Sequence, residues 1–205
     1  MARVKVGIET FTTLPPHPLS SIEIAARHEL EPYQQGSLDG LCGLYAAVNG
    51  LRLALHPYRQ LNRHAVKRLF HSGVEYLERK GWLGDVIQHG MGEKRWRRLV
   101  RHIAKQVQTF DLVAHAEPAS FEKPVTVDSV FAWIVDSLAM GTPVLASFGG
   151  YLDHYSVIVA IDDSRLHLFD SSGFQHVLRA SCGIDTGRHQ IVSSSLLRIV
   201  IEPPG

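Results

Sequence analysis

Hydrophobic and polar positions follow different spacings in the two parts of the chain. Before about residue 140, apolar residues recur every three or four positions with basic residues between them, as in helices that bury one face. This spacing predicts amphipathic helices over 60–80, 93–106 and 126–140. The segment 41–55 carries apolar residues on almost every side, so we expect a helix there that is buried within the domain.

Short runs of β-branched and aromatic residues dominate the last third of the chain. They predict strands over 143–148, 155–161, 165–169 and 196–201, and two further strands near the N-terminus, over 3–13 and 22–28. The stretch 173–195 has no clear period, so we expect a loop or an irregular hairpin. Helices followed by strands favour an α+β fold over a βαβ repeat. We expect a single domain over 1–205, with a helix-rich N-terminal part and a buried helix packed on a C-terminal antiparallel sheet.

The charge balance argues against partners that are recruited by a strong global field. The chain has 205 residues, with 21 basic and 20 acidic side chains and a formal net charge of +1. Such a balance does not attract nucleic acid or an anionic membrane. No apolar run approaches the roughly 18 residues of a membrane helix, and the first six residues alternate charge and apolarity too early for a signal peptide. We expect a cytoplasmic protein that binds neither nucleic acid nor membrane.

Two cysteines are too few for a disulfide framework. Cys42 and Cys182 also lack the paired spacing of zinc ligands, and the histidines show no zinc-site spacing either. We therefore predict no metal and no cofactor. Cys182 precedes Gly183 in the irregular stretch and is interpreted as an incidental thiol.

Cys42 falls in the first turn of the predicted buried helix, which Asp39 can cap. A helix N-terminus places partial positive charge near the sulfur and so favours a nucleophilic thiolate. The flanking Gly40 and Gly43 leave room for a substrate carbonyl. The alternative interpretation is that Cys42 is a small buried hydrophobic residue, as free cysteines often are.

His154 and Asp170 are the candidates for a base and for the group that orients it. His154 precedes the strand predicted over 155–161, and Asp170 follows the strand predicted over 165–169. An antiparallel hairpin turning at 162–164 would bring both residues to the same end. A carboxylate at that place fixes the tautomer and orientation of an imidazole. Taken alone, each residue also has an ordinary interpretation, as a surface or core histidine and as an aspartate that starts a turn.

A thiol hydrolase also needs donors for the oxyanion of its tetrahedral intermediate. The amide of Cys42 can supply one, and the side-chain amide of Gln35, or of Gln34 as the alternative, can supply another. Paired glutamines before a Gly-Ser turn are also common as solvated loop residues.

The ordered set of these segments resembles papain-like cysteine peptidases, and within them the C39-like branch. The resemblance rests on a Gln-to-Cys-Gly segment, a Gly-x-Pro-Val strand, a His-Tyr strand and an Asp-bearing strand end, here at 35–43, 141–144, 154–155 and 170. It implies a papain-like fold and a thioacyl-enzyme on Cys42, with His154 moving the proton. The gap from Gln35 to Cys42 is one residue longer than is usual in that family. Of the site residues, the glutamine assigned to the oxyanion therefore fits the family pattern least well.

These observations predict a cysteine peptidase or isopeptidase that hydrolyses an amide bond through Cys42, His154 and Asp170. The same triad would serve a transglutaminase-like acyl transferase, and a catalytically inactive papain-like adaptor is the non-enzymatic alternative. We expect a protein or peptide substrate. Gly149 and Gly150 beside His154 are compatible with a narrow channel for a ubiquitin-like protein or a Gly-ending peptide.

The basic helix predicted at 94–105 carries an interleaved Trp96. This pattern suggests an acidic protein partner or nucleic acid. The alternative is a solvated face on a helix that packs through Trp96, Leu99, Val100 and Ile103. Because the whole chain is balanced in charge, we favour packing first, an acidic partner second, and nucleic acid least.

Overall fold

The computed structural model describes residues 21–36, 39–184 and 186–202. The strand expected over 3–13 lies outside the described residues. The α-helices of the described residues are α1 (Cys42–Leu55), α2 (Arg63–Arg79), α3 (Leu83–His89), α4 (Glu93–Lys105) and α5 (Val127–Ala139). The strands are β1 (Ile22–Glu23), β2 (Val113–Pro118), β3 (Val144–Gly150), β4 (His154–Ile161), β5 (Arg165–Leu168), β6 (His176–Leu178), β7 (Cys182–Gly183), β8 (His189–Ile191) and β9 (Leu197–Glu202).

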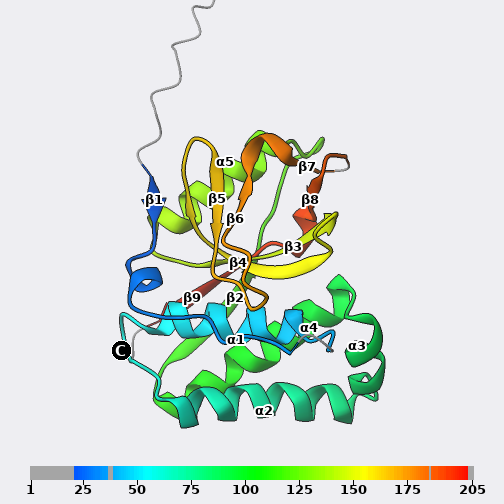
Figure 1. Cartoon of the computed structure of the whole chain (residues 1–205). Helices are drawn as coiled ribbons and strands as arrows, with labels where there is room; N and C mark the ends of the chain where they lie inside the picture. Colours follow the sequence, from blue (N-terminus) through cyan, green and yellow to red (C-terminus); the bar gives the residue numbers. More distant parts are fainter. Residues whose placement is uncertain (1–20, 37–38, 185, 203–205) are drawn as a thin grey trace, which may run out of the picture.

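The strands form one sheet in the order β2-β9-β3-β4-β5-β6, with β1 beside β4 and β8 beside β3. All pairs are antiparallel except β7 with β8. Helices α1 to α4 cover one face of this sheet and α5 lies on the other (Figure 1). The expected α+β class, with an antiparallel sheet built mainly from the C-terminal third, is confirmed.

Most predicted elements form, with shifts of a few residues at their ends. The helices expected at 41–55, 60–80, 93–106 and 126–140 are α1, α2, α4 and α5. The strand expected over 22–28 is wrong in part, because only β1 is extended and a 3-10 helix follows at Ala25–His28. The stretch 173–195 contains the short strands β6, β7 and β8, which the sequence pattern did not predict.

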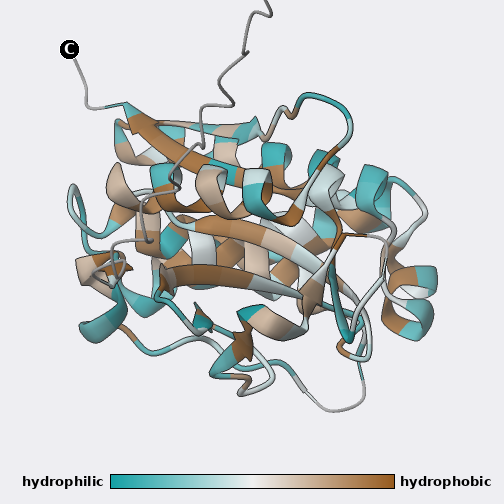
Figure 2. Cartoon of the chain, turned by 90° about the horizontal axis from the view of Figure 1, so that it is seen from above, coloured by the Kyte–Doolittle hydropathy of each residue, from teal (hydrophilic) through white to brown (hydrophobic). Residues whose placement is uncertain are grey.

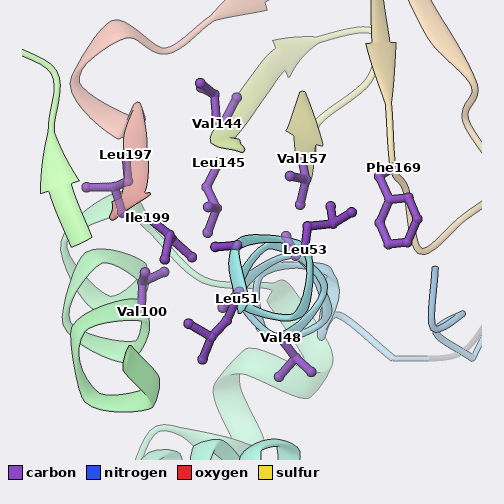
Figure 3. Close-up of a cluster of buried hydrophobic side chains, with 14 of the residues drawn as sticks. Val48, Leu51, Leu53, Val100, Val144, Leu145, Val157, Phe169, Leu197 and Ile199 are labelled. Atoms are coloured by element: carbon purple, nitrogen blue, oxygen red, sulfur yellow. The ribbon is translucent and has the colours of Figure 1, made fainter. Parts of the chain in front are cut away.

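Helix α1 is buried between the sheet and the other helices, as its apolar sequence predicts. Leu51 and Val48 point from α1 into a core that includes Val157 of β4 and Val100 of α4 (Figure 3). A Cβ atom at Gly50 would lie 2.9 Å from the Leu145 side chain, so this glycine lets the helix approach the sheet closely. Apolar residues dominate the strands, whereas the outward sides of the helices are polar (Figure 2).

Helix α4 is anchored by Trp96, which is fully buried. Its indole N–H donates to the carbonyl oxygen of Gly43 at 2.8 Å, and its ring lies against Tyr155 with centroids 4.2 Å apart. Leu99, Val100 and Ile103 on the same helix are also buried, so packing through these residues is confirmed. Trp96 therefore fixes α4 against the first turn of α1.

Gly40 lines the cavity beside Cys42, whereas Gly43 does not, and the side of each glycine on which a Cβ would stand is filled by the protein. A Cβ at Gly40 would lie 2.5 Å from the Val86 carbonyl oxygen and 2.8 Å from the Gly90 nitrogen. A Cβ at Gly43 would lie 2.9 Å from the Trp96 ring. These glycines permit close packing around the start of α1.

We therefore predict that Gly40→Ala lowers the free energy of unfolding by about 1–3 kcal/mol, because backbone atoms cannot move aside as a flexible side chain can. Gly84→Ala is the matched control, since a Cβ there meets nothing within 4 Å. Alanine also favours a helix over glycine by up to about 1 kcal/mol. Urea unfolding of both variants measures the difference, and equal stability of the two would refute this role of Gly40.

Candidate active site

Cys42 is the first residue of α1, and the turn before it leaves the helix N-terminus open. The expectation that Asp39 caps the helix is wrong: its carboxylate accepts a hydrogen bond from the Leu41 N–H at 3.1 Å, one residue ahead of the helix. The Leu44 N–H donates to the Leu41 carbonyl. Cys42 and Gly43 lie in the first turn of α1, where backbone N–H groups have no acceptor within the helix and can bind a developing negative charge.

The β4–β5 hairpin brings His154 and Asp170 together, as the sequence predicts. Ile158 pairs with Leu168, and continuing this register places Asp170 opposite Ser156. His154 is two residues further along β4, so its side chain lies on the same face as Ser156 and diagonally across from Asp170. The hairpin thus delivers a base and its carboxylate to one end of the sheet.

Asp170, His154 and Cys42 lie next to one another in this order. The Nε2–H of His154 donates to Oδ2 of Asp170 at 2.8 Å, and the Cys42 side chain lies close enough to the imidazole to raise its pKa. Because Nε2 is used by Asp170, Nδ1 is the ring nitrogen left for the sulfur. The other carboxylate oxygen accepts from the backbone N–H groups of Ser172 at 2.7 Å and Phe174 at 3.2 Å. The His154 ring is therefore fixed in orientation and tautomer.

The electrostatic environment keeps His154 protonated at neutral pH. Burial alone would lower the pKa of His154, but the hydrogen bonds to Asp170 and Cys42 outweigh it and raise the pKa to about 9. Burial would likewise raise the pKa of Asp170, but the hydrogen bond from His154 lowers it instead. The buried Ser156 hydroxyl also lowers this pKa, although it makes no hydrogen bond of normal geometry. The pair is thus an imidazolium beside a carboxylate.

Cys42, His154 and Gln35 line one cavity of about 680 Å³. Asp39, Glu93 and Asp153 line the same cavity, so its walls carry three carboxylates. Gly149 and Gly150 are not among the residues that line it. Gly150 instead adopts a positive φ of 70° at the end of β3, and a Cβ there would lie 2.7 Å from the Arg188 carbonyl oxygen.

Of the two candidate glutamines, Gln35 is the one that faces the Cys42 cavity. Its backbone N–H donates to the Ser171 carbonyl at 2.9 Å, and its Nε2 donates to the Asp39 carbonyl at 3.3 Å. Gln34 instead directs its Nε2 to the Asp170 carbonyl oxygen at 3.3 Å and lies outside that cavity. Gln34 therefore stabilises the backbone of the segment that carries the Asp170 carboxylate.

Part of the cavity wall comes from a loop that the sequence analysis did not single out. Residues 87–93, from the last residues of α3 through the loop 90–92 to the first residue of α4, line the same cavity as Cys42. The Tyr155 hydroxyl donates to the Met91 carbonyl at 2.8 Å and holds this loop in place, and burial raises the pKa of that tyrosine. The Gly-Met-Gly run at 90–92 is the feature of the sequence that could have identified this loop. Gly90 adopts a positive φ of 71°, a conformation that favours glycine.

Cys182 lies away from this site. It does not line the Cys42 cavity, and its thiol donates to the Leu178 carbonyl at 3.4 Å. Burial raises the pKa of Cys182 to about 11, which disfavours its thiolate at neutral pH. Both cysteines are free thiols.

The comparisons with known proteins give no independent assignment. No family model matches the chain, and no curated protein resembles it in sequence. Within the described residues, no cluster of three or more histidine, cysteine or acidic side chains is arranged to hold a metal ion. In the same part of the chain, no helix combines the length and apolarity needed to cross a bilayer.

We predict that a thiol-alkylating reagent labels Cys42 at least about tenfold faster than Cys182 at neutral pH, because Cys42 lies at a helix N-terminus beside the protonated His154, whereas burial outweighs the nearby Arg179 and raises the pKa of Cys182. His154→Ala should slow labelling of Cys42 and leave Cys182 unchanged. Peptide mass analysis of the time course identifies the labelled residue. Equal labelling of the two cysteines would rule out an activated Cys42.

The raised pKa of His154 also predicts a pH-dependent stability. Its contribution is complete below the unfolded-state pKa of about 6.5 and disappears as the pH rises through about 9. Relative to His154→Gln, the wild-type chain should lose about 2 kcal/mol of unfolding free energy between pH 7 and pH 9. Denaturant unfolding of both proteins at several pH values measures this loss. Parallel curves for the two proteins would show that His154 has no raised pKa.

Proposed function

We propose that this chain is a papain-like cysteine peptidase or isopeptidase that hydrolyses an amide bond through a thioacyl-enzyme. The observation that carries the proposal is the position of His154, which is hydrogen-bonded to Asp170 and lines the same substrate-sized cavity as Cys42. The nucleophile, the base and the orienting group of a triad require this arrangement.

In the first half of the reaction, Cys42 attacks the carbonyl carbon of the scissile amide as a thiolate paired with the protonated His154. The carbonyl oxygen becomes an oxyanion and accepts hydrogen bonds from the N–H of Cys42 and from Gln35. His154 gives its proton to the leaving nitrogen, and the C–N bond breaks to release an amine. The acyl group remains bound to the sulfur as a thioester.

In the second half, His154 accepts a proton from a water molecule that attacks the thioester carbonyl. The C–S bond breaks, the product leaves as a carboxylic acid, and His154 is protonated again beside the sulfur. Asp170 keeps the ring oriented through both steps. The carboxylates in the cavity wall favour neutral or cationic residues next to the scissile bond.

The placement of His154 and Cys42 in the wall of one cavity, where Cys42 helps to raise the pKa of the imidazole, favours an enzyme over an inactive adaptor, in which the two side chains would lie far apart. Acyl transfer to an amine would use the same groups, so the acceptor distinguishes the two reactions. The substrate is sought among peptides and ubiquitin-like proteins extended beyond a C-terminal glycine.

We predict that Cys42→Ala abolishes hydrolysis of any substrate found in such a screen, and that Asp170→Asn lowers kcat by up to about 10⁴ because it removes the tautomer control. Gln35→Ala should be milder, with a loss of about 10²–10³, since one oxyanion donor remains. Cys182→Ala is the matched control and should keep full activity. The wild-type rate should fall above pH 9 as His154 loses its proton.

Turnover by Cys42→Ala would eliminate the proposed mechanism. Mass analysis of the products in the presence of added amines decides between water and an amine as the acceptor. Predominant amide formation would identify an acyl transferase that uses the same triad.

A further inference from the structure

Strand β2 is an open edge of the sheet. Within the described residues it pairs with β9 alone, from Val113 opposite Glu202 to Pro118 opposite Leu197. An edge strand presents unpaired backbone N–H and C=O groups, and these can pair with an added strand. β2 therefore has the backbone chemistry of a peptide-docking edge.

The register decides which backbone groups of β2 face outward. The Ala119 N–H donates to the Leu196 carbonyl at 3.0 Å, directly beyond the last paired residues of the ladder. Because hydrogen-bonded and non-bonded pairs alternate along antiparallel strands, every second residue counted back from Ala119 bonds to β9. Ala114 and Ala116 lie between these positions and direct their N–H and C=O groups away from the sheet. Pro118 has the same orientation, in which its missing N–H is tolerated.

Helix α4 carries a row of cations whose C-terminal members, Arg101 and Lys105, reach this edge. Four basic residues spaced four, three and four positions apart fall on one side of the helix. All four are exposed, and none makes an ion pair within the described residues: Lys94, Arg98, Arg101 and Lys105. The remaining arginines of the helix, Arg95 and Arg97, are instead paired with Asp85 and Glu93.

A groove of about 480 Å³ lies between this row and β2. Arg101, Ala104 and Lys105 line it from α4, and the whole of β2 lines it from the sheet. The acidic side chain in its lining is Glu117, which is paired with Arg198 on β9 at 2.8 Å. The groove thus combines unpaired backbone groups with uncompensated positive charge.

We propose that this groove binds an extended acidic peptide segment of a partner protein, which adds a strand to the edge of β2. Arg101 and Lys105 are separated by about 6 Å along the helix, close to the two-residue repeat of a strand. Carboxylates at alternate positions of the added strand can therefore meet both cations. A second copy of this chain fits less well, because it would bring another cationic α4 to the groove. The proposal does not depend on hydrolysis at Cys42.

The test uses the full chain with Cys42→Ala, so that a bound peptide is not cleaved. The probe is a capped, fluorescent peptide of alternating glutamate and threonine residues, and the control peptide has glutamine in place of glutamate. Fluorescence anisotropy should show saturable binding of the acidic peptide and at least about tenfold weaker binding of the neutral one. Binding should weaken as salt is added.

Charge reversal separates this groove from a general attraction to basic surface. Arg101→Glu with Lys105→Glu should weaken binding at least about tenfold. Arg63→Glu with Lys67→Glu is the matched control, because it makes the same charge change on the exposed face of α2. This control should change affinity by less than about twofold. Equal loss in both variants would overturn the proposal.

Backbone exchange tests the added strand itself. On peptide binding, the amide hydrogens of Ala114 and Ala116 should become protected from exchange, as measured by NMR. The amides of His115 and Glu117 face β9 and should already be protected in the free chain. Binding without new protection at Ala114 and Ala116 would refute strand addition. Equally tight binding of a single-stranded oligonucleotide of matched charge would refute a peptide-specific groove, and dimerisation through β2 would show that a second copy is the occupant.

Discussion

The imidazole of His154 links the sheet, which carries Asp170, to the buried helix, which carries Cys42, in one site. It donates to Asp170 at 2.8 Å on one side and lies beside Cys42 on the other, close enough for the Cys42 side chain to raise its pKa. A buried carboxylate is costly unless its oxygens are satisfied, and here His154 and two backbone N–H groups satisfy it. Loss of the imidazole would leave the fully buried Asp170 carboxylate without its cationic partner. The interaction therefore constrains both the sheet and the buried helix.

Much of the fold serves to hold these groups at contact distance. The register of the β4–β5 hairpin places Asp170 on the same face as His154. Trp96 secures the other partner by donating to the first turn of α1 and packing against Tyr155, the residue next to His154. The same tryptophan fixes α4, whose far end lines the β2 groove. The candidate active site and the proposed docking groove thus share one structural anchor.

The sequence was informative where local pattern and tertiary structure agree. The hairpin around 162–164 could be predicted because the first strand is rich in β-branched residues, apolar residues alternate with polar ones in the second, and a polar turn joins them. α1 could be predicted because its apolar residues surround the whole helix. β2 could not, since its sequence Val-Ala-His-Ala-Glu-Pro has weak strand propensity and its conformation comes from pairing with β9.

Errors near the candidate site have similar causes. Asp39 resembled a helix cap, but its carboxylate binds the N–H of Leu41 before the helix begins. Gly40 lines the cavity, but it also allows close contact with the backbone at Val86 and Gly90, which the sequence did not reveal. This contact depends on α3 and the loop that follows it, and the seven residues of α3 are too few to show a helical period.

NMR titration of the His154 ring in the wild-type chain and in Cys42→Ala tests the central claim most directly. If one imidazole bridges Asp170 and Cys42, its pKa should be about 9 in the wild-type chain and lower in Cys42→Ala, where one of the groups that raise it is lost. The same pKa in both proteins would show that His154 does not interact with the sulfur, and that Cys42 is not the nucleophile of this site.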